Sequence, residues 1–70
     1  MSKLQQLAKL EGVSVEDMLR DAVFDGVSPG ICKNKDCDYT TEVEPDQNRG
    51  WCEDCQENSV ASACVLAEII

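Results

Sequence analysis

Four of the five cysteines in this 70-residue chain form two close pairs. Cys32 and Cys37 have four residues between them, Cys52 and Cys55 have two, and fourteen residues separate the pairs. Two short cysteine loops that fold back on each other can direct four sulfur atoms at one point, as a tetrahedral metal ion requires. The spacing therefore predicts a metal centre with Cys32, Cys37, Cys52 and Cys55 as its ligands.

The ligand set indicates which chemistry such a centre supports. The chain has no histidine, which excludes a mixed cysteine–histidine site and any serine–histidine or cysteine–histidine nucleophile. Four protein ligands leave no coordination position open for water, as is typical of structural rather than catalytic zinc. We therefore expect one structural Zn²⁺ and no enzymatic activity. Iron also binds tetrahedral sulfur sites and is the less favoured metal.

Disulfide bonds are the alternative use of the paired cysteines, and the cellular compartment decides between the two. The N-terminal residues contain no continuous apolar run of the secretory kind, and no stretch approaches the ~18 apolar residues of a membrane span. We therefore expect a cytoplasmic protein that has no membrane association and keeps its thiols reduced. The fifth cysteine, Cys64, lies between Ala63 and Val65 and is predicted to be a core residue.

The charge balance limits the partners of the protein. Fourteen acidic residues against six basic ones give a formal net charge of -8. Such a chain is repelled by phosphate backbones, so nucleic acid is disfavoured and another protein is the expected partner. Ala8, Gly12 and Met18 match the spacing of a helix-turn-helix, but its second helix would carry three acidic residues into the DNA groove beside Arg20 alone. We expect a helical hairpin that packs instead.

Local signals place the helices of this hairpin in residues 1–25. Ser2 is a plausible cap for the first helix, Gly12 ends it, and Ser14 caps the second. Helical spacing predicts an apolar face on the second helix, made of Val15, Met18, Leu19, Ala22 and Val23. Residues 26–30 contain two glycines and a proline, which predicts a short linker between the hairpin and the cysteine-containing part.

The second half of the chain contains strand and helix signals. Alternation in Tyr39–Val43 predicts a strand, and Trp51 is expected to open a short return strand and to shield the metal site or bind a partner. The alternating Glu42, Glu44 and Asp46 form either a solvated strand edge or an acidic contact surface. Apolar spacing predicts a last helix over residues 58–70, capped by Asn58 or Ser59.

The cysteine pairs, with a strand between them and a Gly50-Trp51 return, resemble a zinc ribbon over residues 31–56. The whole chain is similar to small uncharacterised zinc-ribbon proteins of bacteria or phages. The resemblance implies a β-hairpin that carries one four-cysteine zinc site, and contacts with proteins or nucleic acids. The chain departs from the family pattern in its first loop, where four rather than two residues separate the cysteines.

These observations predict a single small α+β domain, stabilised by metal, over residues 1–70. It would consist of a helical hairpin, a linker, a zinc-ribbon β-hairpin and a C-terminal helix. The leading functional hypothesis is a structural zinc-binding protein that acts as a protein-interaction module. The alternatives are a nucleic-acid-associated regulator and an iron-binding, rubredoxin-like electron carrier, which would be coloured and reversibly reducible.

Overall fold

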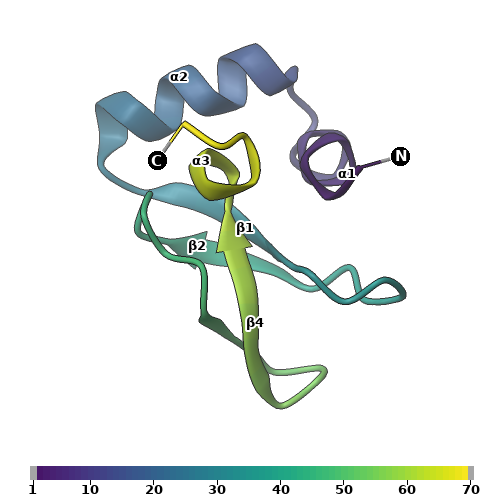
Figure 1. Cartoon of the computed structure of the whole chain (residues 1–70). Coiled ribbons are helices and arrows are strands. Elements are labelled where there is room, and N and C mark those ends of the chain that lie inside the picture. Colours follow the sequence, from purple (N-terminus) through teal and green to yellow (C-terminus); the bar gives the residue numbers. More distant parts are fainter. Residues whose placement is uncertain (1, 70) are drawn as a thin grey trace.

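The computed structural model describes residues 2–69, which form an α+β fold, as predicted. In this part of the chain the four strands make one antiparallel sheet in the order β2-β1-β4-β3. The three helices gather at one end of the molecule, and the strands extend away from them (Figure 1). The elements are α1 (Lys3–Glu11), α2 (Val15–Asp25), β1 (Ser28–Cys32), β2 (Thr40–Val43), β3 (Gly50–Cys52), β4 (Glu57–Ser62) and α3 (Ala63–Leu66).

Helices α1 and α2 begin and end where the local signals predicted. The hydroxyl of Ser2 accepts the backbone N–H of Gln5 at 3.1 Å, and the Gln5 side chain accepts the N–H of Ser2, which completes a capping box. Gly12 ends α1 in the left-handed conformation, at φ 73°. Ser14 caps α2 by accepting the N–H of Asp17 at 3.1 Å. The predicted helical hairpin is confirmed.

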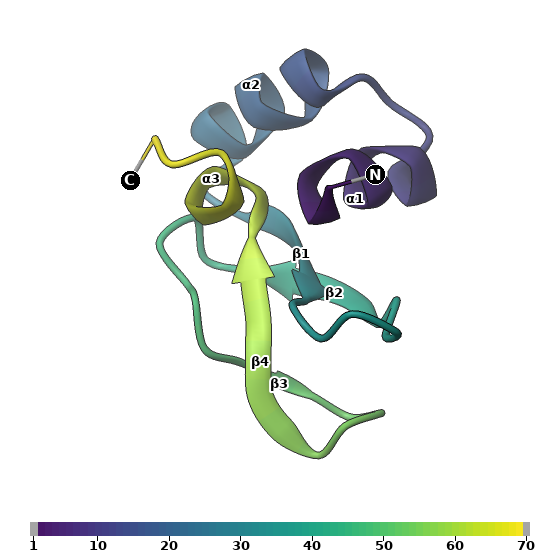
Figure 2. The same ribbon diagram turned by 45° about the vertical axis from the view of Figure 1, so that its right-hand side comes forward.

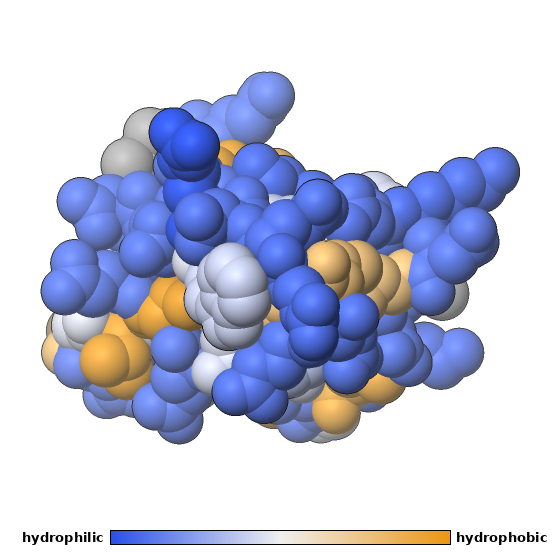
Figure 3. All heavy atoms as spheres, turned by 90° about the horizontal axis from the view of Figure 1, so that it is seen from below, coloured by the Kyte–Doolittle hydropathy of each residue, from blue (hydrophilic) through white to orange (hydrophobic). Residues whose placement is uncertain are grey.

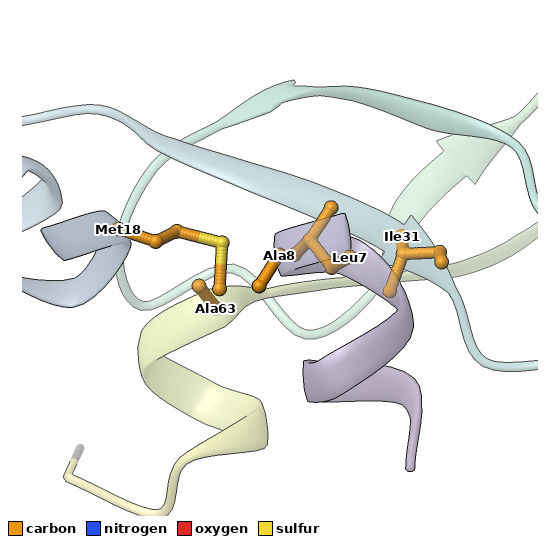
Figure 4. Close-up of a cluster of buried hydrophobic side chains, with 5 residues drawn as sticks. All are labelled: Leu7, Ala8, Met18, Ile31 and Ala63. Atoms are coloured by element: carbon orange, nitrogen blue, oxygen red, sulfur yellow. The ribbon is translucent and has the colours of Figure 1, made fainter. Parts of the chain in front are cut away.

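The helices bury a first hydrophobic core against β1. Its members are Leu7, Ala8, Met18, Ile31 and Ala63, which come together between the helices and the strand in Figure 4. The predicted apolar face of α2 is only partly correct. Met18 and Ala22 are buried, whereas Val23 is 68% exposed. The reason is that α2 packs against β1, α1 and α3 with the side that carries Met18 and Ala22, and Val23 lies outside that side.

The predicted linker over residues 26–30 is largely wrong, because residues 28–32 form strand β1. Gly26 ends α2 at φ 72°, so the break is correct, but β1 begins two residues later and lies between β2 and β4. Pairing of β1 with β4 starts at Gly30, so Pro29 has a strand partner, Glu42, on one side only. A proline fits a sheet at such a position because no neighbouring strand there requires its missing N–H as a hydrogen-bond donor.

The predicted C-terminal helix over 58–70 is also wrong for most of its length. Residues 57–62 form β4, the helix comprises only Ala63–Leu66, and residue 70 lies outside the described residues. The cap is Ser62, whose hydroxyl accepts the N–H of Val65 at 3.1 Å, and not Asn58 or Ser59. Residues 59–64 are all buried because β4 lies between two strands and leads into the helical core. A short, continuous buried run is mostly apolar in a strand and in a helix alike, so the spacing of its residues does not distinguish the two.

The strand pairing differs from the single hairpin that was expected between residues 39–43 and the return strand. Strands β2 and β3 form the two edges of the sheet; β2 pairs with β1, and β3 pairs with β4. The sheet nevertheless curls until its edges approach each other. A Cβ atom on Gly30 would lie 2.9 Å from both Val43 and Val60, and one on Gly50 would lie 3.3 Å from Val43 and 3.2 Å from Val60. Val43 of β2 is thus close to Gly50 of β3.

Candidate metal centre

Each cysteine pair lies at the end of a β-hairpin. Cys32 is the last residue of β1 and Cys37 lies in the loop to β2; Cys52 is the last residue of β3 and Cys55 lies in the turn to β4. The β1–β4 pairing, which sets Cys32 opposite Val60, aligns the two hairpins, and their loops project in the same direction in Figure 2. The structure therefore brings together all four cysteines that the spacing predicted as ligands.

The sulfur atoms have the separations of a tetrahedral site. All four Sγ atoms lie within 4.8 Å of one another, with 3.8 Å between Cys32 and Cys55 and 3.7 Å between Cys37 and Cys52. A tetrahedron with metal–sulfur bonds of ~2.3 Å has edges of ~3.8 Å, whereas a disulfide bond is only ~2.05 Å long. All five cysteines are free thiols. The cluster can hold one metal ion, and its geometry suits zinc and iron equally.

The cluster has a buried side and an outer side. Cys32 and Cys52 are fully buried and form a second small core with Val60, against which Tyr39 and Val43 pack. Cys37 and Cys55, which lie in the loops, are half-buried. A metal ion bound here would therefore be reached from solvent on the side of the loop cysteines.

Trp51 does not take the shielding position that was expected of it. On β3 it alternates with the buried Gly50 and Cys52, and 52% of its surface is exposed. Side chains of successive strand residues point to opposite faces, so Trp51 faces away from Cys52. The structure leaves it available for contact with another molecule.

Hydrogen bonds reach three of the ligand sulfurs. Ser59 Oγ lies 3.1 Å from Cys32 Sγ, the Asn34 side-chain amide donates to Cys55 Sγ at 3.2 Å, and the backbone N–H of Cys55 donates to Cys52 Sγ at 3.3 Å. The sequence carries no signal for the role of Asn34, and Ser59 was predicted to be a helix cap. Both contacts cross from one hairpin to the other, so no local signal could have identified them.

The environment of the sulfurs separates their pKa values. Burial opposes ionisation of Cys32, but hydrogen bonds from Ser59, the Asn34 backbone and the neighbouring thiols outweigh it and lower the pKa of Cys32 from 9.0 to about 7. At Cys37 a backbone hydrogen bond from Tyr39 favours the thiolate, but burial and the adjacent thiols prevail and raise its pKa to about 12. Cys32 thus ionises readily, and its negative charge opposes ionisation of the neighbouring thiols until a cation is bound.

The first helix is attached to the metal centre. Lys3 on α1 donates from its ammonium group to the backbone carbonyl of Cys37 at 2.6 Å, across 34 residues of sequence. In the loop that carries Cys37, Lys33 donates to the carbonyl of Asn48 at 2.9 Å. These contacts connect the first cysteine loop to α1 on one side and to the segment before β3 on the other.

Cys64 lies outside the cluster, as predicted. It is buried, with 1% of its surface exposed, at the start of α3, and burial raises the pKa of its thiol. The predicted acidic strand residues Glu42, Glu44 and Asp46 are all exposed. Among residues 2–69, the four paired cysteines are the only group of three or more cysteine, aspartate or glutamate side chains placed to share a metal ion.

No family model, curated protein or solved structure matches this chain, so the zinc-ribbon resemblance gains no support from relatives. The assignment of a metal centre therefore depends on the sulfur geometry of the chain itself. No helix in the described part of the chain is both long enough and apolar enough to cross a bilayer.

Proposed function

We propose that the protein binds one Zn²⁺ ion through Cys32, Cys37, Cys52 and Cys55 as a structural centre. The observation that carries this proposal is the set of sulfur separations, 3.7 and 3.8 Å across the two pairs, which match the edges of a zinc–thiolate tetrahedron. Four thiolates complete the coordination of the metal and leave no position for a substrate. The expected role of the metal is therefore in folding and not in catalysis.

The size of the second core supports a folding role. Within residues 2–69 the buried members of this core are two of the ligands, Cys32 and Cys52, and a single other residue, Val60. A chain of this length also buries little apolar surface in total. Binding of a metal to thiolates that are dispersed in the unfolded chain contributes directly to folding free energy. On this proposal, the metal holds the β1–β2 and β3–β4 hairpins together where apolar packing is too limited to do so.

Elemental analysis of protein purified without added metal, together with chelator-induced unfolding followed by circular dichroism, tests this proposal. One equivalent of zinc, with strand signal lost on chelation, is expected. One equivalent of iron, with visible colour and reversible reduction, would instead favour the rubredoxin-like electron carrier. Protein without metal and with oxidised cysteines would contradict the proposed centre.

We further propose that the metal-stabilised fold is a non-enzymatic module that binds a basic segment of another protein. Two adjoining hollows, of about 230 and 130 Å³, lie between α1, α2 and the first two strands. We call them together the acidic groove. Their floor includes Val13, Met18 and Pro29, and their acidic residues are Glu11, Asp21, Asp25 and Glu42.

The charges of the acidic groove favour a cationic partner. The only ion pair that the structure describes joins Arg20 to Asp17, so within residues 2–69 the groove carboxylates have no cationic partner. Asp21 and Asp25 lie four residues apart on α2, and Asp25 is in the last turn, where an anion is unfavourable to the helix. A lysine or arginine side chain would relieve both repulsions and lay its aliphatic stem over the apolar floor.

Exposed apolar residues also lie near the end of α2, and one of them, Val27, lines the acidic groove. Phe24 is 81% exposed, Val23 68% and Val27 46%, and all three lie at the C-terminal end of α2 or directly after it. The opposite end of the molecule is mostly hydrophilic, with small separate apolar patches (Figure 3). The helical end is therefore the side on which we place the partner.

NMR titration of the metal-loaded protein with a lysine-rich peptide tests this part of the proposal. Shifts should concentrate on α2 and the start of β1, weaken with added salt, and diminish in the Asp21→Asn/Asp25→Asn double variant. Glu53→Gln/Asp54→Asn, which removes two charges at the other end of the molecule, is the matched control. No response to the peptide would contradict the proposed binding of a basic segment. A stronger response to a DNA duplex would favour the nucleic-acid alternative.

A further inference from the structure

Two hydrogen bonds to ligand sulfurs cross between the hairpins in opposite directions. Asn34, in the β1–β2 loop, donates to Cys55 Sγ of the other hairpin at 3.2 Å. Ser59, on β4, lies with its hydroxyl 3.1 Å from Cys32 Sγ at the end of β1. A thiolate can only accept a hydrogen bond, so in the metal-bound state both the amide and the hydroxyl must be donors. Each hairpin thus supplies a donor to a ligand of the other.

We propose that Asn34 and Ser59 are positioning residues of the metal centre, which align the two hairpins and set the strength of its sulfur ligands. This inference rests on the proposed metal binding, because it concerns the ligand sulfurs. Hydrogen bonds to a ligand withdraw electron density from the sulfur and stabilise its negative charge. Four thiolates on a divalent ion leave two excess negative charges in a protein whose formal net charge is already -8. Hydrogen bonds that stabilise this excess charge on the sulfurs therefore favour metal binding.

Asn34 acts on the outer side of the centre. Its amide nitrogen is 2.6 Å from a carboxylate oxygen of Glu57 as well as 3.2 Å from Cys55 Sγ, so both amide hydrogens have acceptors and the orientation of the side chain is fixed. Cys55 is half-buried, and it is one of the two ligands that solvent and chelators can reach. Loss of the Asn34 amide is therefore expected to accelerate metal release as well as to weaken binding.

Ser59 acts on the buried side. Its side chain is 7% exposed, and Cys32 has no exposed surface, so water cannot replace the hydroxyl once it is removed. A buried thiolate that loses a hydrogen bond has no alternative donor from solvent, and the full cost falls on metal binding. Ser59 should therefore affect the equilibrium affinity more than Asn34 does.

Zinc affinities of Asn34→Ala, Ser59→Ala and wild type, measured by competition with a chromophoric chelator, provide the first test. Removal of an outer hydrogen bond to a metal ligand typically lowers affinity by about 10- to 100-fold, which is the loss expected for both variants. Asn58→Ala is the matched control, because Asn58 is an exposed amide next to Ser59 without a side-chain hydrogen bond in the described part of the chain. Its affinity should equal that of the wild type.

Cobalt substitution separates sulfur tuning from a merely structural role. Without its hydrogen bond a thiolate donates electrons more readily, so the thiolate-to-Co²⁺ charge-transfer band should move to longer wavelength in both alanine variants. Asn34→Gln and Ser59→Thr retain a donor and should restore the band. A weaker affinity with an unmoved band would overturn the inference, as would alanine variants that behave like Asn58→Ala. A wild-type protein that binds neither Zn²⁺ nor Co²⁺ would instead refute the proposed metal centre.

If Ser59→Ala does not fold, Asn34→Ala decides the question, because Asn34 is exposed and its removal creates no cavity. For this variant the rate of zinc transfer to excess chelator should rise in proportion to the loss of affinity. Glu57→Gln keeps an acceptor for the Asn34 amide and should release zinc at the wild-type rate. Equal release rates in wild type and Asn34→Ala would contradict the role assigned to Asn34.

Discussion

Ile31 and Cys32 are consecutive residues of β1, and neither has any exposed surface, yet they belong to different cores. Side chains alternate along a strand, so Ile31 packs against Leu7 and Met18 beneath the helices while Cys32 faces the sulfur cluster and Val60. A shift of β1 by one residue would place the ligand in the helical core. Strand β1 therefore couples the helical part of the protein to the candidate metal centre.

Metal binding should require the four clustered cysteines but not the fifth, Cys64. Cys52→Ser is expected to lower the bound metal well below one equivalent and to destabilise both hairpins, because Cys52 is a buried ligand. Cys64→Ala should keep one equivalent and lose about 1 kcal/mol of stability from the removal of one buried atom. Elemental analysis and thermal unfolding of the two variants check this, and metal loss in Cys64→Ala would contradict the assignment.

Two glycines should tolerate substitution differently because they are required for different reasons. A Cβ on Gly30 would lie 2.9 Å from Val43 and Val60, so Gly30→Ala overpacks the curl of the sheet and should cost about 1–3 kcal/mol. Gly12 has free space around its Cβ position but a φ of 73°, which asparagine tolerates. Urea unfolding should therefore show a smaller loss for Gly12→Asn than for Gly30→Ala. The reverse order would refute the close approach of β2 and β4 at Gly30.

Ser62 should contribute more to stability than an ordinary helix cap. Its fully buried hydroxyl accepts the N–H of Val65 and donates to the carbonyl of Pro45, in the connection between β2 and β3. Ser62→Ala removes the cap and leaves the half-buried Pro45 carbonyl without its donor, for a total of about 2 kcal/mol. Ser14→Ala, an exposed cap on α2, should cost about 1 kcal/mol in the same urea titration. Equal costs would mean that the Pro45 contact contributes nothing.

The sequence was sufficient for features that depend on neighbouring residues. Ser2, Gly12 and Ser14 satisfy backbone groups within one turn of helix, so the boundaries of α1 and α2 could be predicted. The cysteine cluster could also be predicted, because each pair is a short loop and a tetrahedral site must use both. These predictions needed no knowledge of how the strands pair.

The errors occurred where distant contacts override local signals. Gly30 resembles a linker glycine, but its small size makes room for Val43 and Val60, which are thirteen and thirty residues away in sequence. Val60 and Ala63 have helical spacing, but β4 is buried between two strands, so a strand satisfies the same apolar pattern. The roles of Asn34 and Ser59 depend on the alignment of the two hairpins and could not be obtained from spacing.

Metal affinity should increase steeply with pH. Burial and adjacent thiols outweigh the Tyr39 backbone hydrogen bond and raise the pKa of Cys37 to about 12; burial and adjacent thiols likewise raise that of Cys55, despite hydrogen bonds from Asn34 and Cys37. At pH 8 both groups therefore hold protons that binding must displace, so affinity should change at least about 100-fold per pH unit.

Below pH 7 Cys32 also becomes protonated, because hydrogen bonds from Ser59, the Asn34 backbone and other thiols overcome burial and lower its pKa only to about 7. Three or more protons must then leave for each metal ion, so the affinity should fall more steeply as the solution becomes more acidic. Calorimetric titration in two buffers of different ionisation enthalpy counts these protons. Fewer than two protons released at pH 8, or an affinity that is independent of pH, would show that the four thiols do not act together as ligands.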